Sequence, residues 1–195
     1  MANLLTSRSV TFIDIETTHL DPKYGTILSI AIITDWENGK KDVWSTKIKP
    51  KDIEMEFASK TALKICKYNP EDWDDAPSFE DVSCEIAKRL EWGPIVGHNI
   101  QFDLSHIKSV FKRFGWRQVD RLENNLIPEN RCFKIGYPII DTCALAFIFT
   151  PSERQNLSAL RQFYEIDEEG RAHNALADAE DCRQIFYNIV NMIKD

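Results

Sequence analysis

Residues 10–18 read VTFIDIETT, and their β-branched and aromatic side chains predict a strand over Val10–Ile15 with a break at Thr17–Thr18. Because side chains alternate between the two faces of a strand, Asp14 and Glu16 project from the same face, about 6.6 Å apart along the chain. Folding alone gives no reason to place two like charges there. A pair of hard cations such as Mg²⁺ or Mn²⁺, which prefer carboxylate oxygen, explains them. The alternative is that Glu16 is an ordinary solvated residue at the end of a strand.

Two further strands are predicted directly after this one. Thr26–Asp35 is apolar on both faces, and it follows a turn at Asp21–Gly25 in which the proline fixes φ and the glycine permits a positive φ. Asn38–Gly39 is a strong hairpin signal that leads into a third strand over Asp42–Ile48. Three successive strands joined by short turns predict an antiparallel meander.

The pattern then changes to helices alternating with short strands. Helices are predicted from Ser78 to Leu90, from Asp103 to Gly115, over Asp141–Phe149, around Leu157–Phe163 and over Ala175–Ile193, with strands at Pro94–Gly97 and Ile139–Ile140. Arg117–Tyr137 has no clear period and is interpreted as an irregular connection. The order predicts an α/β fold whose mixed β-sheet, an antiparallel meander plus parallel strands, is flanked by α-helices. No repeat or linker divides residues 1–195, which indicates a single domain.

The composition is that of a soluble globular chain, with 43% hydrophobic and 28% charged residues among 195. No apolar run approaches the roughly 20 residues that span a bilayer, so no membrane association is expected. Met1–Ser9 lacks the features of a secretion signal. The five cysteines are odd in number and include no CxxC pair, which indicates free thiols and a cytoplasmic location.

The net charge of −7 argues mildly against a protein that coats a polyanion. It is compatible with an enzyme that binds one end of a nucleic-acid strand through metal ions. Four carboxylates gathered at a site repel phosphate when alone and attract it once two divalent cations are bound.

Two later segments carry further candidate residues. His98–Asp103 reads HNIQFD after the predicted strand Pro94–Gly97, and His173–Asp178 reads HNALAD at the start of the last helix. Each has an ordinary explanation when taken alone. Asp103 is able to complement a helix dipole, and His173 is able to be an exposed residue of a capping region.

Taken in order, FIDIETT, GHNIQFD and HNALADA resemble the three exonuclease motifs of the DnaQ-like family. The histidine five residues before the last aspartate matches its DEDDh branch, because the sister branch has tyrosine there. Ile140–Thr142 and Asn156–Leu160 resemble the internal IDT and NLxxL segments of the family. The resemblance extends over about residues 10–192 and includes the proofreading domains of bacterial DNA polymerase III epsilon type.

The resemblance implies an RNase H-like fold and a 3′→5′ exonuclease that releases nucleoside 5′-monophosphates. Asp14, Glu16 and Asp178 would bind the first of two divalent metal ions, Mg²⁺ or Mn²⁺. Asp14 would also contact the second ion, which Asp103 would support through water. Two such ions activate the attacking water and neutralise the leaving 3′-oxygen. His173 would be the general base, a role that its unperturbed pKa of about 6.5 suits.

Five more residues are expected to contact the terminal nucleotides. Leu20 falls where similar enzymes place an apolar wedge, and Phe102 is placed to stack on a base. Core packing is the alternative for both. Thr17 and Asn99 are candidates for hydrogen bonds to the nucleotide, and His98 is included among the substrate-binding residues.

The sequence departs from the family pattern at two places. His19 stands where the family has glycine, which raises the question of whether a positive φ is needed there. Arg117–Tyr137 is longer and more polar than expected, which suggests a rim or lid over the substrate groove.

The expected partner is the 3′ end of single-stranded DNA or RNA, with DNA favoured. Alternatives are an exoribonuclease or oligoribonuclease-like enzyme, a nucleotide phosphatase, and a non-catalytic module that binds nucleic acid or a polymerase. No tail rich in Pro, Ser or Gln follows the last helix, which favours a free-standing enzyme or a small subunit recruited to a polymerase or replication partner by its folded surface. The oligomeric state is left open.

Overall fold

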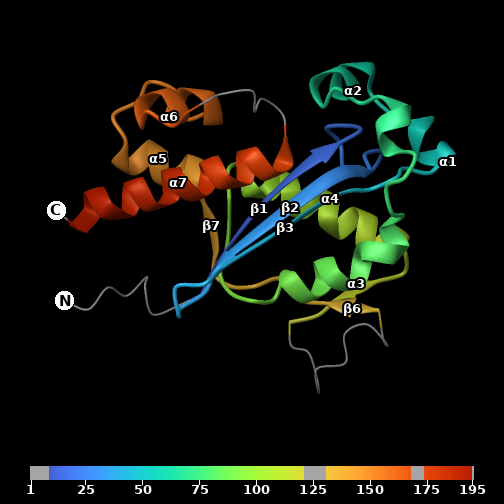
Figure 1. Ribbon diagram of the computed structural model, residues 1–195, viewed down its shortest axis with the longest axis horizontal. Helices are drawn as coiled ribbons and strands as arrows, with labels where there is room; N and C mark the ends of the chain where they lie inside the picture. Colours follow the sequence, from blue (N-terminus) through green and yellow to red (C-terminus); the bar gives the residue numbers. More distant parts are fainter. Residues whose placement is uncertain (1–8, 121–130, 168–173, 195) are drawn as a thin grey trace.

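The computed structural model describes residues 9–120, 131–167 and 174–194, and they form a mixed sheet covered by helices on both faces (Figure 1). The sheet has the strand order β3-β2-β1-β4-β7. Its strands are β1 Val10–Thr17, β2 Ile27–Asp35, β3 Lys41–Lys47, β4 Ile95–Gly97 and β7 Ile139–Asp141. The two antiparallel pairs β1–β2 and β2–β3 form the predicted meander, and β4 and β7 add to β1 in parallel. The predicted mixed sheet is therefore confirmed.

The helices account for most of the remaining described residues. They are α1 Asp52–Met55, α2 Lys60–Ile65, the 3₁₀ helix η1 Pro70–Trp73, α3 Phe79–Arg89, α4 Ile100–Arg113, α5 Thr142–Phe149, α6 Leu157–Phe163 and α7 Ala175–Lys194. A separate two-stranded ladder pairs β5 Arg117–Gln118 with β6 Cys132–Phe133. Among these helices, none combines the length and the apolar composition that a membrane crossing requires.

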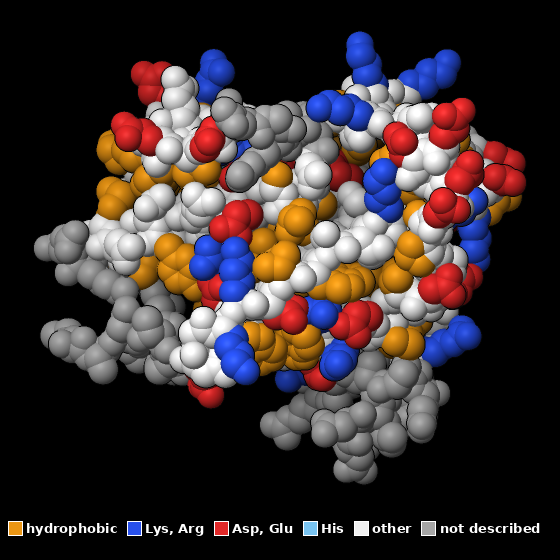
Figure 2. Space-filling view, viewed as in Figure 1, with side chains coloured by type: hydrophobic (Ala, Val, Ile, Leu, Met, Phe, Trp, Pro, Cys, Tyr) orange, Lys and Arg blue, Asp and Glu red, His pale blue; other side chains and the backbone are white. Residues whose placement is uncertain are grey.

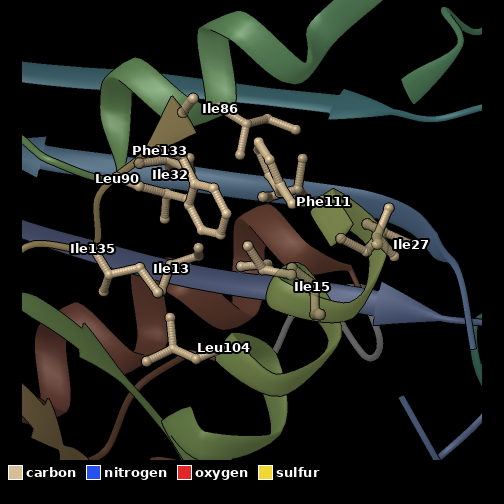
Figure 3. Packing of buried hydrophobic residues seen from close by; sticks show 14 of the residues in the cluster. Ile13, Ile15, Ile27, Ile32, Ile86, Leu90, Leu104, Phe111, Phe133 and Ile135 are labelled. Atoms are coloured by element: carbon tan, nitrogen blue, oxygen red, sulfur yellow. The ribbon is translucent and has the colours of Figure 1, made fainter. Parts of the chain in front are cut away.

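The first strand is buried on both faces because two different helical layers cover it. On one face, Ile13 and Ile15 pack with residues of α3 and α4 such as Ile86 and Phe111 (Figure 3). On the other face, Phe12 packs against α7. Burying an isoleucine or phenylalanine contributes about 1.5–3 kcal/mol, so these two layers fix which way each residue of β1 points. Asp14 and Glu16 continue the row of Phe12, on the face that α7 covers.

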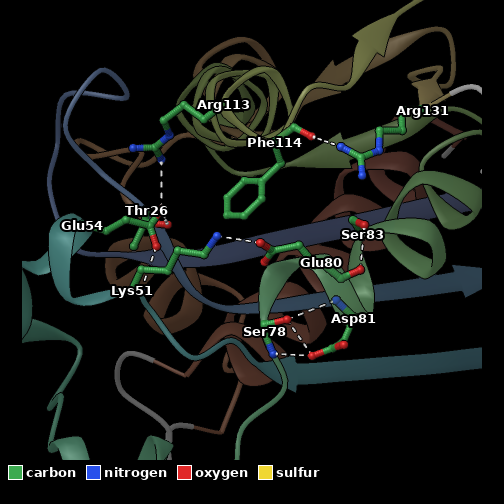
Figure 4. A network of polar contacts seen from close by, with 10 residues as sticks. All are labelled: Thr26, Lys51, Glu54, Ser78, Glu80, Asp81, Ser83, Arg113, Phe114 and Arg131. Atoms are coloured by element: carbon green, nitrogen blue, oxygen red, sulfur yellow. Dashed lines mark hydrogen bonds and ion pairs between the residues drawn. The ribbon is translucent and has the colours of Figure 1, made fainter.

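The chain between β3 and α3 forms α1, α2 and η1, which the sequence did not predict. Ser59 caps α2 through the backbone N–H of Ala62, and the indole of Trp73 donates to the carbonyl of Leu28. Ion pairs and hydrogen bonds join this segment to α3, to α4 and to Thr26, which precedes β2 (Figure 4). Lys51 contacts Glu80 of α3, and this helix begins with a capping box formed by Ser78 and Asp81, as the same view shows.

Two local predictions were wrong in detail. The helix predicted to start at Asp103 begins at Ile100, after Asn99 in the left-handed conformation with φ of 58°. Gly25 does not adopt the predicted positive φ, because the glycines that do so are Gly39 and Gly115 among the described residues. A Cβ on Gly25 would lie 2.8 Å from the carbonyl oxygen of His19, so close packing and not the sign of φ requires glycine here.

The five cysteines all lie in described parts of the chain, and all are free thiols, as predicted. Parts of the irregular connection form β5 and β6, which pack against α4 and α3. The rim predicted over Arg117–Tyr137 includes residues 121–130, which lie outside the described residues, so it stays a prediction.

Candidate active site

Three carboxylates meet where the end of β1 passes the start of α7. Asp14 and Glu16 point from β1 toward α7, and Asp178 lies in the first turn of that helix. One carboxylate oxygen from each of the three lies within 4.8 Å of the other two. Three hard oxygen donors at this separation fit a divalent cation such as Mg²⁺ or Mn²⁺. The structure thus brings together the three residues that the sequence predicted as ligands of the first metal.

Asp103 lies behind this group and is 3% exposed. Its Oδ1 accepts a hydrogen bond of 3.1 Å from the backbone N–H of Ile15. The neighbouring strand β4 pairs with β1 only at Thr11 and Phe12, so this carboxylate satisfies a strand N–H beyond the end of that ladder. Asp103 is not part of the group of three, and its expected indirect role stays a prediction.

The electrostatics of the site are those of crowded acids. The side chain of Asp14 is partly exposed, yet protein surrounds its carboxylate closely. This burial raises the pKa of Asp14 well above the usual range, and the charges of Asp103, Asp178 and Glu16 raise it further. Burial likewise raises the pKa of Asp103, and the charges of Glu16 and Asp141 add to this effect. Without cations the site therefore favours bound protons, and divalent cations would relieve the same repulsion.

This repulsion predicts that an asparagine at position 14 stabilises the metal-free protein at neutral pH. Below about pH 4, the usual pKa of aspartate, the carboxyl is protonated in both states and costs nothing. As the pH rises, the unfolded chain loses this proton first, and folding loses stability until the pH passes the raised folded pKa. In EDTA at pH 7, we expect Asp14→Asn to melt about 1–8 °C above wild type, with a smaller difference at pH 4.

Thermal melts followed by circular dichroism in EDTA at both pH values measure this difference. Asp75→Asn, at an exposed position, is the control and should match wild type. A melting temperature of Asp14→Asn below that of wild type at pH 7 would show that the negative charge of Asp14 does not destabilise the folded protein.

Arg161 was missed by the sequence analysis, yet it contacts the site directly. Its guanidinium bonds Asp178 and also donates to Oδ2 of Asp181 at 2.6 Å. Its positive charge lowers the pKa of Asp14, against the larger effects that raise it. One signal in the sequence could have shown it: Arg161 takes an inward position of α6, one turn after Leu157, where an arginine needs an acidic partner.

Cys66 is a second residue that the sequence analysis missed. It ends α2, and its Sγ donates to Oε2 of Glu16 at 3.1 Å. Burial, and then the charge of Glu16, raise the pKa of this thiol to about 12, so it remains a neutral donor. It came to the site through a segment whose helices were not predicted.

The residues expected to contact nucleotides fall into two groups. Leu20 is 76% exposed, which rules out core packing for it, and Phe102 is partly buried. His106 links them: its Nε2 lies 2.9 Å from the carbonyl oxygen of His19 and its Nδ1 lies 3.0 Å from that of Phe102. The loop that carries Leu20 is thereby fixed to α4. His19 itself is not among the described residues with positive φ, so the missing glycine demands no such conformation.

The other group, Thr17, His98 and Asn99, already makes hydrogen bonds within the protein. The hydroxyl of Thr17 donates to the carbonyl of His19 at 3.1 Å. His98 Nδ1 lies 3.0 Å from the hydroxyl of Thr142, and burial lowers the pKa of His98. The backbone N–H of Asn99 donates to Oδ1 of Asp141 at 3.0 Å, which leaves its side chain as the candidate for a nucleotide contact.

Basic side chains flank the acidic site on one side. Figure 2 shows Lys and Arg side chains gathered over α2, which carries Lys60 and Lys64. Residues 57–70 contain three lysines and no acidic residue, although the whole chain has a net charge of −7. The charge is therefore unevenly distributed, and its basic part lies next to Glu16, which α2 reaches through Cys66. His173, the predicted base, lies outside the described residues.

Comparison with known families gives one clear match. The model of the family RNase_T, described as exonuclease, matches residues 11–186. Among curated proteins, the DNA polymerase III PolC-type of Thermotoga petrophila is 28% identical over 93% of this chain. The DNA polymerase III subunit epsilon of Salmonella typhimurium is 32% identical over 57% of it. The chain spans only 12% of the first relative and 42% of the second.

Solved structures share the fold at low sequence identity. Exonuclease I of E. coli, in complex with a dT13 oligonucleotide, superposes with a TM-score of 0.71 at 16% identity, over 94% of this chain and 40% of its own. Exonuclease X, in complex with 5′ overhanging duplex DNA, superposes with a TM-score of 0.62 at 21% identity. The match covers 93% of this chain and 91% of Exonuclease X. The likeness confirms the expected RNase H-like fold.

Proposed function

Because this chain belongs to the RNase_T exonuclease family, we propose that it is a metal-dependent 3′→5′ exonuclease that hydrolyses single-stranded nucleic acid as a single domain. Membership confirms the resemblance to DnaQ-like exonucleases that the three motifs indicated. The observation that supports the mechanism best is the group formed by Asp14, Glu16 and Asp178. Packing gives no reason to crowd three carboxylates, whereas phosphodiester hydrolysis requires a concentrated positive charge that such a group can hold.

Each residue of the site has a proposed task. Asp14, Glu16 and Asp178 would hold two Mg²⁺ or Mn²⁺ ions, and Asp103, which bonds the backbone of β1 at Ile15, would support the second ion indirectly. The bound cations would supply a more acidic water and charge neutralisation at the phosphate. His173 would accept the proton of the attacking water. The thiol of Cys66 holds one oxygen of Glu16 and so restricts how that carboxylate turns.

DNA is the favoured substrate, because the relatives carry names of DNA polymerase III and Exonuclease I was solved with a DNA oligonucleotide. The same relatives favour a polymerase as the protein partner. An exoribonuclease is the second candidate, since the carboxylate group would act on the phosphodiester, which DNA and RNA share. The lysines of α2 would contact phosphates of the strand whichever sugar it carries.

The exposed side chain of Leu20 predicts a specific loss of substrate affinity. An apolar side chain that is 76% exposed contributes little to folding, but a terminal base would cover it. We expect Leu20→Ala to raise KM about 5–30-fold, equivalent to about 1–2 kcal/mol, with an unchanged melting temperature. Steady-state hydrolysis of a short oligonucleotide measures this.

The matched control for Leu20 is Phe147→Ala, at a position on α5 that is also 76% exposed. It removes an exposed apolar group and should leave KM as in wild type. Equal KM values for Leu20→Ala and wild type would remove Leu20 from the substrate site.

The activity itself is tested with 5′-labelled single-stranded DNA and RNA of one sequence, in Mg²⁺, Mn²⁺ or EDTA. We expect a ladder that shortens from the 3′ end, with DNA cut faster, and no cleavage in EDTA. Release of inorganic phosphate from nucleotides instead of nucleoside monophosphates would identify a phosphatase. Binding of the strands without cleavage in any metal would identify a non-catalytic module.

A further inference from the structure

Arg161 is a buried cation held between two acidic residues of one helix. It is 7% exposed, and Asp181, to which its Nε donates at 2.6 Å, is 1% exposed. The same guanidinium also bonds Oδ1 of Asp178 through Nη2. Asp178 and Asp181 lie three residues apart on α7 and therefore share a face of that helix. A single side chain of α6 thus bridges a candidate metal ligand and a carboxylate that is not part of the ligand group.

We propose that Arg161 is a positioning residue that holds Asp178 in the orientation required for metal binding, an inference that rests on the proposed function. A carboxylate has two oxygens, and the contact with Arg161 engages one of them. The guanidinium is planar and rigid, so the bond from Nε to Asp181 fixes its orientation, and the bond from Nη2 then restricts the rotation of the Asp178 carboxylate. Asp178 thereby keeps an oxygen within 4.8 Å of oxygens from Asp14 and Glu16.

Asp181 acts in this arrangement as the anchor for Arg161. A buried arginine without a partner is strongly unfavourable, and Asp181 supplies a negative charge that stays buried whether or not metal is bound. When cations occupy the group, Asp178 shares its charge with them, and Asp181 still balances Arg161. The ligand is therefore able to bind metal without leaving the arginine uncompensated.

Two other roles for Arg161 lead to different measurements. If it only fastens α6 to α7, its loss lowers stability and leaves the affinity for metal unchanged. If it is a competing cation that occupies Asp178, its loss makes metal bind more tightly. A positioning residue gives the opposite result, because the loss of groups that orient ligands typically weakens metal binding about 10–100-fold.

The decisive variant is the double substitution Arg161→Leu with Asp181→Leu. This variant removes one positive and one negative charge, so neither Arg161 nor Asp181 is left buried without the other, and only Asp178, in the site itself, loses a contact. The exchange of a buried ion pair for apolar side chains is often neutral for stability. Titration calorimetry with Mn²⁺ alone measures the dissociation constant, and melts in EDTA report the fold. We expect the Kd for Mn²⁺ to rise about 10–100-fold. An unchanged or lower Kd would overturn the proposal.

The matched control is a second buried arginine with two acidic partners, away from the site. Arg89 of α3 is 9% exposed, donates to Glu85 at 2.8 Å and also contacts Asp42. Arg89→Leu with Glu85→Leu should leave the Mn²⁺ affinity of wild type intact. A rise in Kd in this control as large as in the Arg161 double variant would mean that general loosening explains both, and would also overturn the proposal.

Arg161→Lys covers the case in which the double variant does not fold. Lysine keeps the charge but not the rigid fork, so it cannot hold both carboxylates in one geometry, and we expect an intermediate rise in Kd. Wild-type affinity in this variant would show that charge alone suffices and would contradict positioning. Failure of wild type to bind Mn²⁺ would reject the proposed function together with the role of Arg161. Binding by wild type with no change in either variant would reject only the role of Arg161.

Discussion

Asp14→Asn is expected to lower the rate of 3′-end hydrolysis by about 10³-fold or more while the fold is retained. Bound cations stabilise the charge of the transition state by several kcal/mol, and each 1.36 kcal/mol, by rough conversion, is a factor of ten in rate. Burial, and then the charges of Asp103, Asp178 and Glu16, raise the pKa of Asp14, so its carboxylate lies close to each of these acids. Single-turnover cleavage of a 5′-labelled oligonucleotide at saturating Mg²⁺ measures the loss.

The stability of the same variant separates loss of chemistry from loss of structure. Asp14→Asn should be inactive and yet melt above wild type in EDTA, a combination that misfolding cannot produce. Asp75→Asn, which changes an exposed carboxylate in the same way, should keep wild-type activity. Cleavage by Asp14→Asn within tenfold of the wild-type rate would contradict the metal-ion mechanism.

His173→Ala is expected to reduce the rate by about 10²–10⁴-fold, the usual contribution of a general base. Because His173 is proposed as a base and not as a ligand, the Kd for Mn²⁺ should stay that of wild type. The wild-type rate should fall as the pH drops below about 6.5, the unperturbed pKa of histidine, and this fall should be absent in the variant. Stopped assays from pH 5 to pH 8 measure both profiles.

A suitable control for this histidine is His19→Ala, which removes an imidazole from the loop beside the site. It should retain the pH dependence of wild type, because His19 is not proposed to accept a proton; its Nδ1 accepts a hydrogen bond from the backbone N–H of Asp21. If the affinity for Mn²⁺ collapsed in His173→Ala, His173 would be a ligand and the assignment of the base would be wrong.

The parts of the fold that the sequence predicted correctly are those with a repeating pattern long enough to read. The two-sided apolar run of β2 and the amphipathic α7 both extend over many residues, and their predicted bounds agree with the structure to within one residue. The helices α1 and α2 have four and six residues, too few to show a period. Contacts with distant residues hold them in place, such as the hydrogen bond from Thr26 to Glu54 of α1 and the one from the backbone N–H of Ser59, the cap of α2, to the carbonyl of Thr18.

The site shows the same division between local and distant information. Asp14, Glu16 and Asp178 were found because they stand in ordered motifs next to predicted elements. Arg161 and Cys66 reach the site from segments that no motif marks, and only the packing of α6 and α2 brings them to Asp178 and Glu16. The residues that adjust the ligands were therefore less predictable than the ligands themselves.

The most direct test of the central claim is a crystal structure with Mn²⁺ and a nucleoside 5′-monophosphate, with anomalous scattering used to locate the metal. Anomalous density bounded by the carboxylates of Asp14, Glu16 and Asp178, with the phosphate against it, is the predicted result. Manganese bound elsewhere, or a phosphate bound away from these three carboxylates, would contradict the proposed site.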